Sequence, residues 1–209
     1  VCSSDLGAAK AMAGAVHGRQ GLFPDPTTSG ADLHAHPLSA APQLDGYASD
    51  WGGLTARSHS VAWSNPARAP AKLAMGRHGA HLYLLLDVQD STPTHAQTGE
   101  PLSADHIVIR IIDRNQVRHH YLVDTSESGP IQAYALTRDK LGQPEAIQEL
   151  RIHGAERRSG DGYLLEMRVP LSLLGPRLSI TITDRTRTGE AARADTAQGH
   201  EQLGVLVLP

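Results

Sequence analysis

The sequence predicts an all-β protein, an antiparallel β-sandwich preceded by a short N-terminal helix. Three observations support this fold class. From Leu44 onward, apolar residues recur with a period of two, which is the period of a strand with one buried face. These runs are short and are separated by turn residues, and no stretch of helical period lies between them. Short strands at such spacing are typical of antiparallel sandwiches.

The first 41 residues are predicted to precede the sandwich. Residues 1–20 are rich in alanine and predict a helix, whereas prolines and a glycine in residues 21–41 predict an irregular connector. The first six residues are similar to the translated read-through of a common sequencing adapter. We therefore expect residues 1–6 to be foreign to the natural protein, and the chain to be a piece of a longer one. The apolar residues of the expected helix are Leu6, Ala9, Met12, Ala13 and Val16.

The sandwich is predicted to span residues 42–209. In its run 163–169, alternation places Tyr163 and Met167 on one face and Glu166 and Arg168 on the other, outward face. An Asp-Gly turn signal precedes this run. The predicted strands are 72–75, 81–89, 105–113, 117–124, 131–137, 149–153, 163–169 and 178–183.

Composition and motifs argue against several classes of function. The net charge of -3 provides no basic surface, so we expect no nucleic-acid partner. No apolar run reaches the roughly 18 residues that cross a bilayer. The single cysteine, Cys2, cannot form an internal disulfide. The sequence contains no nucleophile elbow, phosphate loop, paired-cysteine metal site or dinucleotide fingerprint, so we predict no catalytic residue.

Trp51 and Trp63 are the two tryptophans, and aromatic residues make up 4% of the chain. Sugar sites usually depend on aromatic rings that stack on the sugar, so this scarcity argues against strong carbohydrate binding. We expect Trp51 to pack in the core. A loop-like Ser-Asn-Pro follows Trp63, which leaves core packing and ligand contact both open for that ring.

Four aspartates, Asp45, Asp87, Asp90 and Asp184, lie at the ends of predicted strands. Carboxylates in such places could hold Ca²⁺, which takes six to eight oxygen ligands. No calcium-loop spacing is present, and aspartates at turns commonly accept hydrogen bonds from their own backbone. We therefore favour a structural role in turns for these aspartates and assign no metal ligand. Ca²⁺ is the one cofactor that remains possible.

Twelve histidines raise the question of another metal site. His34 and His36 would share a face of a strand, whereas His119 and His120 would point to opposite faces. The spacing indicates no third ligand, so surface or capping roles are favoured. A histidine cluster that titrates near pH 6 is the alternative.

The ordered motifs resemble family-nine carbohydrate-binding modules and the wider DOMON-like sandwiches. An apolar-Asp-Gly stretch followed by Trp opens the resemblance at residues 44–51, and a Gly-Tyr-x-x-Glu-x-x-x-Pro strand follows at residues 162–170. Between them, residues 82–90 end on an aspartate and residues 105–109 begin on one. The resemblance implies structural roles for Asp45, Gly46, Trp51, Gly162, Tyr163, Glu166 and Pro170.

Residues 18–23 and 33–38, with the preceding helix, resemble the extracytoplasmic sensor region of certain proteobacterial histidine kinases, among them those of a dedicated sortase system. This implies a non-catalytic periplasmic sensor of a homodimeric inner-membrane kinase, with a cognate response regulator as partner and a small molecule or glycan as ligand. The alternatives are a carbohydrate-binding module of a secreted enzyme and a purely structural sandwich. The candidate ligand-binding residues are Trp63, Asp87, Asp90 and His106.

Overall fold

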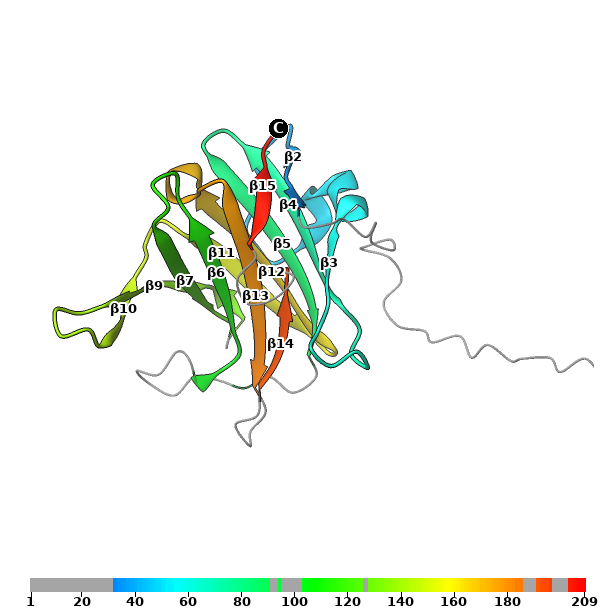
Figure 1. Ribbon diagram of the computed structural model, residues 1–209. Coiled ribbons are helices and arrows are strands. Elements are labelled where there is room, and N and C mark those ends of the chain that lie inside the picture. Colours follow the sequence, from blue (N-terminus) through cyan, green and yellow to red (C-terminus); the bar gives the residue numbers. More distant parts are fainter. Residues whose placement is uncertain (1–31, 91–93, 95–102, 126–127, 186–190, 197–202) are drawn as a thin grey trace, which may run out of the picture.

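The computed structural model describes residues 32–90, 94, 103–125, 128–185, 191–196 and 203–209, which form two β-sheets packed face to face (Figure 1). This confirms the predicted β-sandwich. The expected helix of residues 1–20 lies outside the described residues. No described helix is long and apolar enough to cross a membrane.

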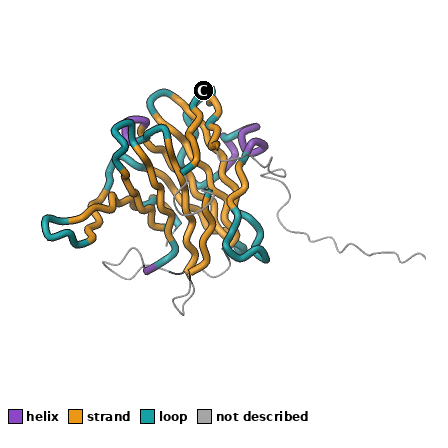
Figure 2. The backbone as a smooth tube through the Cα atoms, viewed as in Figure 1, coloured by secondary structure: helices purple, strands orange, loops and turns teal. Residues whose placement is uncertain are grey.

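Strands make up most of the described structure, and the helices are short 3₁₀ segments at its margins (Figure 2). The 3₁₀ segments are η1 (Ala48–Asp50), η2 (Gly52–Arg57) and η4 (Leu171–Leu173). The strands are β1 (Asp32–His34), β2 (His36–Pro37), β3 (His59–Val61), β4 (Ala71–His78), β5 (His81–Gln89), β6 (His106–Ile112), β7 (Arg118–Asp124), β8 (Gly129–Pro130), β9 (Gln132–Arg138), β10 (Pro144–Gln148), β11 (His153–Ser159), β12 (Gly162–Pro170), β13 (Arg177–Arg185), β14 (Ala191–Asp195) and β15 (Gly204–Val207).

The first sheet has the order β1-β15-β13-β6-β7-β9-β10. In addition, β14 pairs with residues 181–185 of β13, beyond the part of β13 that pairs with β15. The second has the order β2-β4-β5-β12-β11-β8, with β3 also paired to β4. Two pairs, β1 with β15 and β2 with β4, are parallel, and the other pairs among the described strands are antiparallel. Both parallel pairs involve the segment 32–37.

This segment differs from the irregular connector predicted for residues 21–41. Asp32–His34 pairs with the last strand, β15, in the first sheet, and His36–Pro37 pairs with β4 in the second. The chain therefore crosses from one sheet to the other at Ala35, whose N–H donates to the carbonyl of Val207 at 2.9 Å. Alternation alone does not reveal strands this short.

The main core lies between the sheets and is built from the alternating faces of the central strands. In β5, Leu82, Leu84 and Leu86 enter this core, while Tyr83 and Leu85 enter a second apolar cluster on the outer face of the sheet. The second cluster is completed by Trp51 and by Leu54 of η2. The uninterrupted apolar run of β5 is explained by burial on both faces.

Glu166 attaches the segment with Trp51 and Leu54, here called the outer cover, to the second sheet. The sequence placed its side chain on the outward face of β12, and that face is here covered, so that Glu166 is 0% exposed. One carboxylate oxygen accepts from the Asp45 N–H at 3.0 Å and the Gly46 N–H at 2.6 Å, and the other accepts from Trp51 Nε1 at 2.6 Å. Trp51 is 2% exposed, which is the inward packing expected of it.

Gly46 is required where this cover meets β11. Its φ is +81°, and a Cβ there would lie 2.6 Å from the Cβ of Arg157. Any other residue would clash with β11 or leave the left-handed conformation. The Asp-Gly of the first motif is thus explained by close approach, with the Asp45 side chain accepting from the Tyr47 N–H at 2.9 Å.

One strand prediction in the middle of the chain was wrong, and the two strands beside it, β10 and β11, were not predicted. The run 149–153 was predicted as a strand, but residues 150–151 form the turn between β10 and β11. β10 is exposed at every position, and β11 turns the charged Glu156 and Arg158 toward the interior. Neither strand has the apolar alternation on which the prediction depended.

Replacing Glu166 with glutamine tests the attachment of the cover. Three donors converge on the carboxylate, and an amide offers one acceptor oxygen and turns its own N–H groups toward a donor. We expect E166Q to lower the free energy of unfolding by about 1–3 kcal/mol in urea titrations. The matched control E145Q, on exposed β10, should change it by less than about 0.5 kcal/mol. Equal stability of the two variants would contradict this role of Glu166.

Candidate functional site

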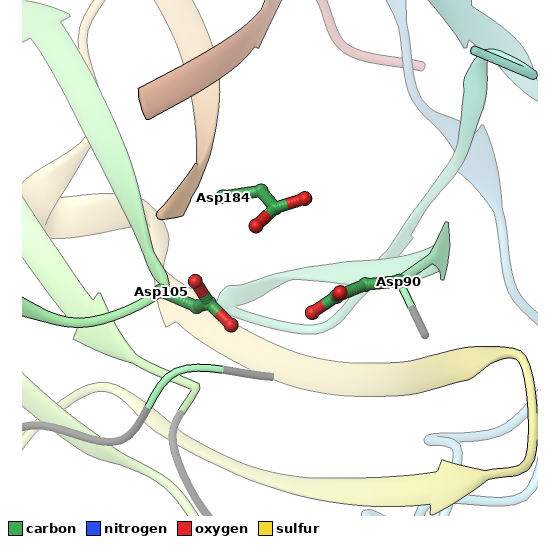
Figure 3. Close-up of side chains that lie close together, drawn as sticks. All are labelled: Asp90, Asp105 and Asp184. Atoms are coloured by element: carbon green, nitrogen blue, oxygen red, sulfur yellow. The ribbon is translucent and has the colours of Figure 1, made fainter. Parts of the chain in front are cut away.

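Three aspartates converge at the end of the sandwich where β5 and β13 finish and β6 begins. Asp90 follows β5, Asp105 precedes β6, and Asp184 is the penultimate residue of β13. One carboxyl oxygen from each lies within 4.8 Å of the others. Figure 3 shows the three carboxyl groups around a common space. All three residues are buried, Asp184 being the most exposed at 9%.

Backbone groups hold Asp105 in the centre of the cluster. Its Oδ1 accepts from the Arg185 N–H and its Oδ2 from the Thr94 N–H, both at 2.8 Å. Its own N–H donates to the Thr94 carbonyl at 3.1 Å. The side chain therefore bridges the start of β6 and the end of β13, and its orientation is set before any ligand arrives.

Two arginines neutralise part of the acidic charge. Arg68 donates to Oδ2 of Asp184 and to the carbonyl of Gln89. The Nη1 of Arg158 lies 3.9 Å from Oδ2 of Asp90, and its Nε lies 2.9 Å from Oε1 of Glu156. Glu156 is thus a fourth buried carboxyl group at this end of the core.

Burial raises the pKa values of Asp105, Glu156 and Asp184. It raises the pKa of Asp105 to about 7, with a further contribution from Asp90 and Asp184, against the hydrogen bonds that Asp105 accepts. It raises the pKa of Glu156 to about 8, against the attraction of Arg158. Burial also raises the pKa of Asp184, and its hydrogen bond from Arg68 opposes that rise.

The charge balance shows what the site can do chemically. The guanidinium groups of Arg68 and Arg158 contact Asp184, Asp90 and Glu156, whereas Asp105 accepts hydrogen bonds from backbone N–H groups. Carboxyl groups this close together are stabilised by protons, as the raised pKa values of Asp105, Glu156 and Asp184 indicate, or by a divalent cation. Hard carboxylate oxygens suit Ca²⁺, with water to complete its coordination. The donor set therefore fits that ion.

The structure gathers some of the predicted acidic residues and not others. Asp90 and Asp184 meet in the cluster. Asp45 lies in the turn held by Glu166, and Asp87 lies on the outer face of β5, in register with Lys72. Asp105 was not among the predicted ligands, although it begins a predicted strand, because its meeting with Asp184 depends on the pairing of β6 with β13.

Trp63 lies beside the cluster but offers no open ring for a sugar. It is 6% exposed, belongs to the main core, and has the Arg68 guanidinium 3.9 Å from its ring centroid. Of the two possibilities left open by the sequence, the structure places this ring in the core. Arg68 thereby joins Trp63 to Asp184.

The histidines in the described part of the chain are dispersed over both sheets. His106 is buried, its Nδ1 lies 2.7 Å from the Ala104 carbonyl, and burial lowers its pKa. The rings of His34 and His59 are stacked with centroids 6.5 Å apart. His36 belongs to the other sheet from His34, so the predicted common face of this pair is not formed. His119 pairs with Asp113 at 3.1 Å.

Comparison with known proteins gives structural likeness without sequence similarity. No protein-family model and no curated protein matches the chain. Two structures of a family-nine carbohydrate-binding module from Caldicellulosiruptor kristjanssonii, with cellotriose and with glucose, share its fold at a TM-score of 0.60 and 16% identity. The alignments cover 84% and 85% of this chain and 93% and 95% of the module.

A third structure, from Bacteroides uniformis ATCC 8492 and described provisionally as a carbohydrate-binding protein, has a TM-score of 0.59 at 10% identity. That alignment covers 87% of this chain and 100% of the other. The chain is therefore a β-sandwich of the kind found in carbohydrate-binding modules. More particularly, its fold is similar to that of family-nine modules over most of the length of both.

The buried carboxyl groups predict how stability depends on pH. The pKa values of Glu156 and Asp105 in the folded state exceed their ordinary values, so folding takes up protons in the window between these values. Histidines with lowered pKa values, such as His106, oppose this below pH 6.5. In a buffer without divalent cations, the free energy of unfolding should therefore fall from pH 6.5 to about 8. Urea titrations across this window measure it.

The variant E156Q isolates one part of this effect. It removes the group with the highest carboxyl pKa given above, so the decline toward pH 8 should become shallower. A free energy of unfolding that is constant or rises over the window would show that these carboxyl groups are ionised without penalty.

Proposed function

We propose that this chain is a non-catalytic, Ca²⁺-dependent binding domain with a glycan as its ligand. The observation that carries the proposal is the convergence of Asp90, Asp105 and Asp184, whose buried carboxyl oxygens lie within 4.8 Å of one another. A cation there ties together the ends of β5 and β13 and the start of β6. Because the three carboxyl groups are buried, its role is to fix this end of the sandwich rather than to contact a polysaccharide directly.

The glycan part of the proposal draws on the fold. The two family-nine structures reported above were solved with cellotriose and with glucose. Fold alone does not determine a ligand, and the buried Trp63 supplies no stacking surface. A glycan nevertheless remains the ligand class that this likeness favours over others.

Binding of Ca²⁺ is tested directly by calorimetry and thermal unfolding. We expect saturable binding and a higher melting temperature in millimolar Ca²⁺, because the ion binds the folded state preferentially. D105N and D184N should abolish both effects, whereas D87N, outside the cluster, should retain them. Affinity should rise from pH 6 to 8 as the carboxyl groups lose protons. The same response to Ca²⁺ in D105N and D87N would refute the cation site.

Glycan binding is measured with cellotriose and glucose as probes, each with Ca²⁺ and with a chelator. The proposal expects saturable binding that weakens when the chelator is added. Absence of binding to either sugar in Ca²⁺ would overturn the glycan assignment while leaving the cation site to its own test.

The second candidate function is the extracytoplasmic sensor region of a membrane histidine kinase, with a response regulator as the downstream partner. The observation that favours it is the pairing of the two terminal segments, β1 with β15. β13 pairs with β15 at one end and carries Asp184 at its other end. β13 thus links the acidic cluster to β15 and, through it, to β1, the last and first described strands, a route by which ligand binding would alter their relative position.

The full reading frame distinguishes the two roles. The sensor proposal expects membrane spans on both sides of this domain and a kinase core after it. A secretion signal together with a glycosidase domain would contradict the sensor and support a carbohydrate-binding module of a secreted enzyme.

A further inference from the structure

A second site candidate lies on the outer face of the β2–β4 sheet, away from the acidic cluster. A hollow of about 370 Å³ opens there between residues 37–41 and the two 3₁₀ segments η1 and η2. This volume is at the lower end of the range of small-molecule sites, and it suits a compact ligand rather than a polymer. The lining of the hollow includes the apolar Leu38, Trp51 and Leu54 and the charged Asp50 and Arg57.

The floor of the hollow is apolar and built in advance. Leu54 and Trp51 belong to the outer apolar cluster, and Leu38 packs against it. Leu38 is held by its N–H, which donates to the Arg77 carbonyl at 2.9 Å, and its carbonyl lies 3.1 Å from Nδ1 of His78. Gly76 lies beneath, where a Cβ would come within 2.5 Å of Leu38. The floor therefore requires no rearrangement to receive an apolar group.

Two opposite charges line the hollow without pairing to each other. Asp50 and Arg57 are both exposed, and no ion pair joins them in the described part of the chain. Asp50 is oriented by the Gln43 N–H, which donates to its Oδ2. Among the described residues, no hydrogen bond or ion pair reaches the Arg57 guanidinium. An arginine so placed is available to a carboxylate, which it binds with two parallel hydrogen bonds.

We propose that this hollow binds a free α-amino acid with an apolar side chain. Arg57 takes the carboxylate, Asp50 takes the ammonium group, and the side chain lies on the floor formed by Leu38 and Leu54. The zwitterion matches the charges of the wall, and neither a neutral sugar nor a simple anion uses both of them. This site is independent of the cation cluster and of the glycan proposal.

Calorimetric titration of the full chain with L-leucine tests the proposal. We expect saturable binding that weakens about tenfold or more in R57A and in D50N, because each removes one charged partner. Asparagine at position 50 keeps an acceptor for the Gln43 N–H, so the loop is preserved. The matched control R118A, which removes an exposed arginine from the other sheet, should bind as the parent does.

Two ligand analogues test which charged groups of the amino acid the site recognises. N-acetyl-L-leucine lacks the ammonium group and L-leucinamide lacks the carboxylate, and both should bind about tenfold or more weakly than L-leucine. Equal affinity for either analogue would overturn the zwitterion assignment. Absence of saturable binding by L-leucine, or unchanged binding in R57A, would overturn the site. Circular dichroism of each variant separates a lost contact from a lost fold.

Discussion

The three hydrogen bonds accepted by Glu166 connect the first motif of the chain to the centre of the second sheet. Burial raises the pKa of this carboxyl group to about 7, and the hydrogen bonds from Trp51, Gly46 and Asp45 favour the ionised form against that rise. These hydrogen bonds hold the outer apolar cluster against β5 and β12. Residues of that cluster also form the floor of the hollow beside η1 and η2. An apolar residue at position 166 would leave three donors in the interior unsatisfied.

The fold was predictable because its central strands carry the simplest pattern. β5, β6, β12 and β13 have apolar alternation, and their predicted ranges lie close to the observed ones. β11 escaped prediction because Glu156 and Arg158 occupy its inward positions, where the pattern requires apolar residues. The same two residues belong to the acidic end of the core. One of the unpredicted strands therefore carries charged groups of the candidate site.

Only two residues of the candidate site were predicted from their place at strand ends in the sequence. Asp90 and Asp184 stand at strand ends, which is visible in the sequence, whereas Asp105, Arg68 and Glu156 approach them through strand pairing and sheet packing across long sequence separations. The spacing of these residues along the chain does not indicate that their side chains lie close together in the fold. Likewise, nothing in the residues around Trp63 indicates that the Arg68 guanidinium lies over its ring.

The crossing of residues 32–37 between the sheets has a consequence for the handling of this protein. β1 and β2 lie at the ends of their sheets, against β15 and β4. A chain shortened to begin at the first motif, near residue 42, would lose both strands and uncover hydrogen-bonding edges on each layer of the sandwich. Exposed edges of this kind recruit strands from neighbouring molecules. The few residues before the first motif thus protect the domain from self-association.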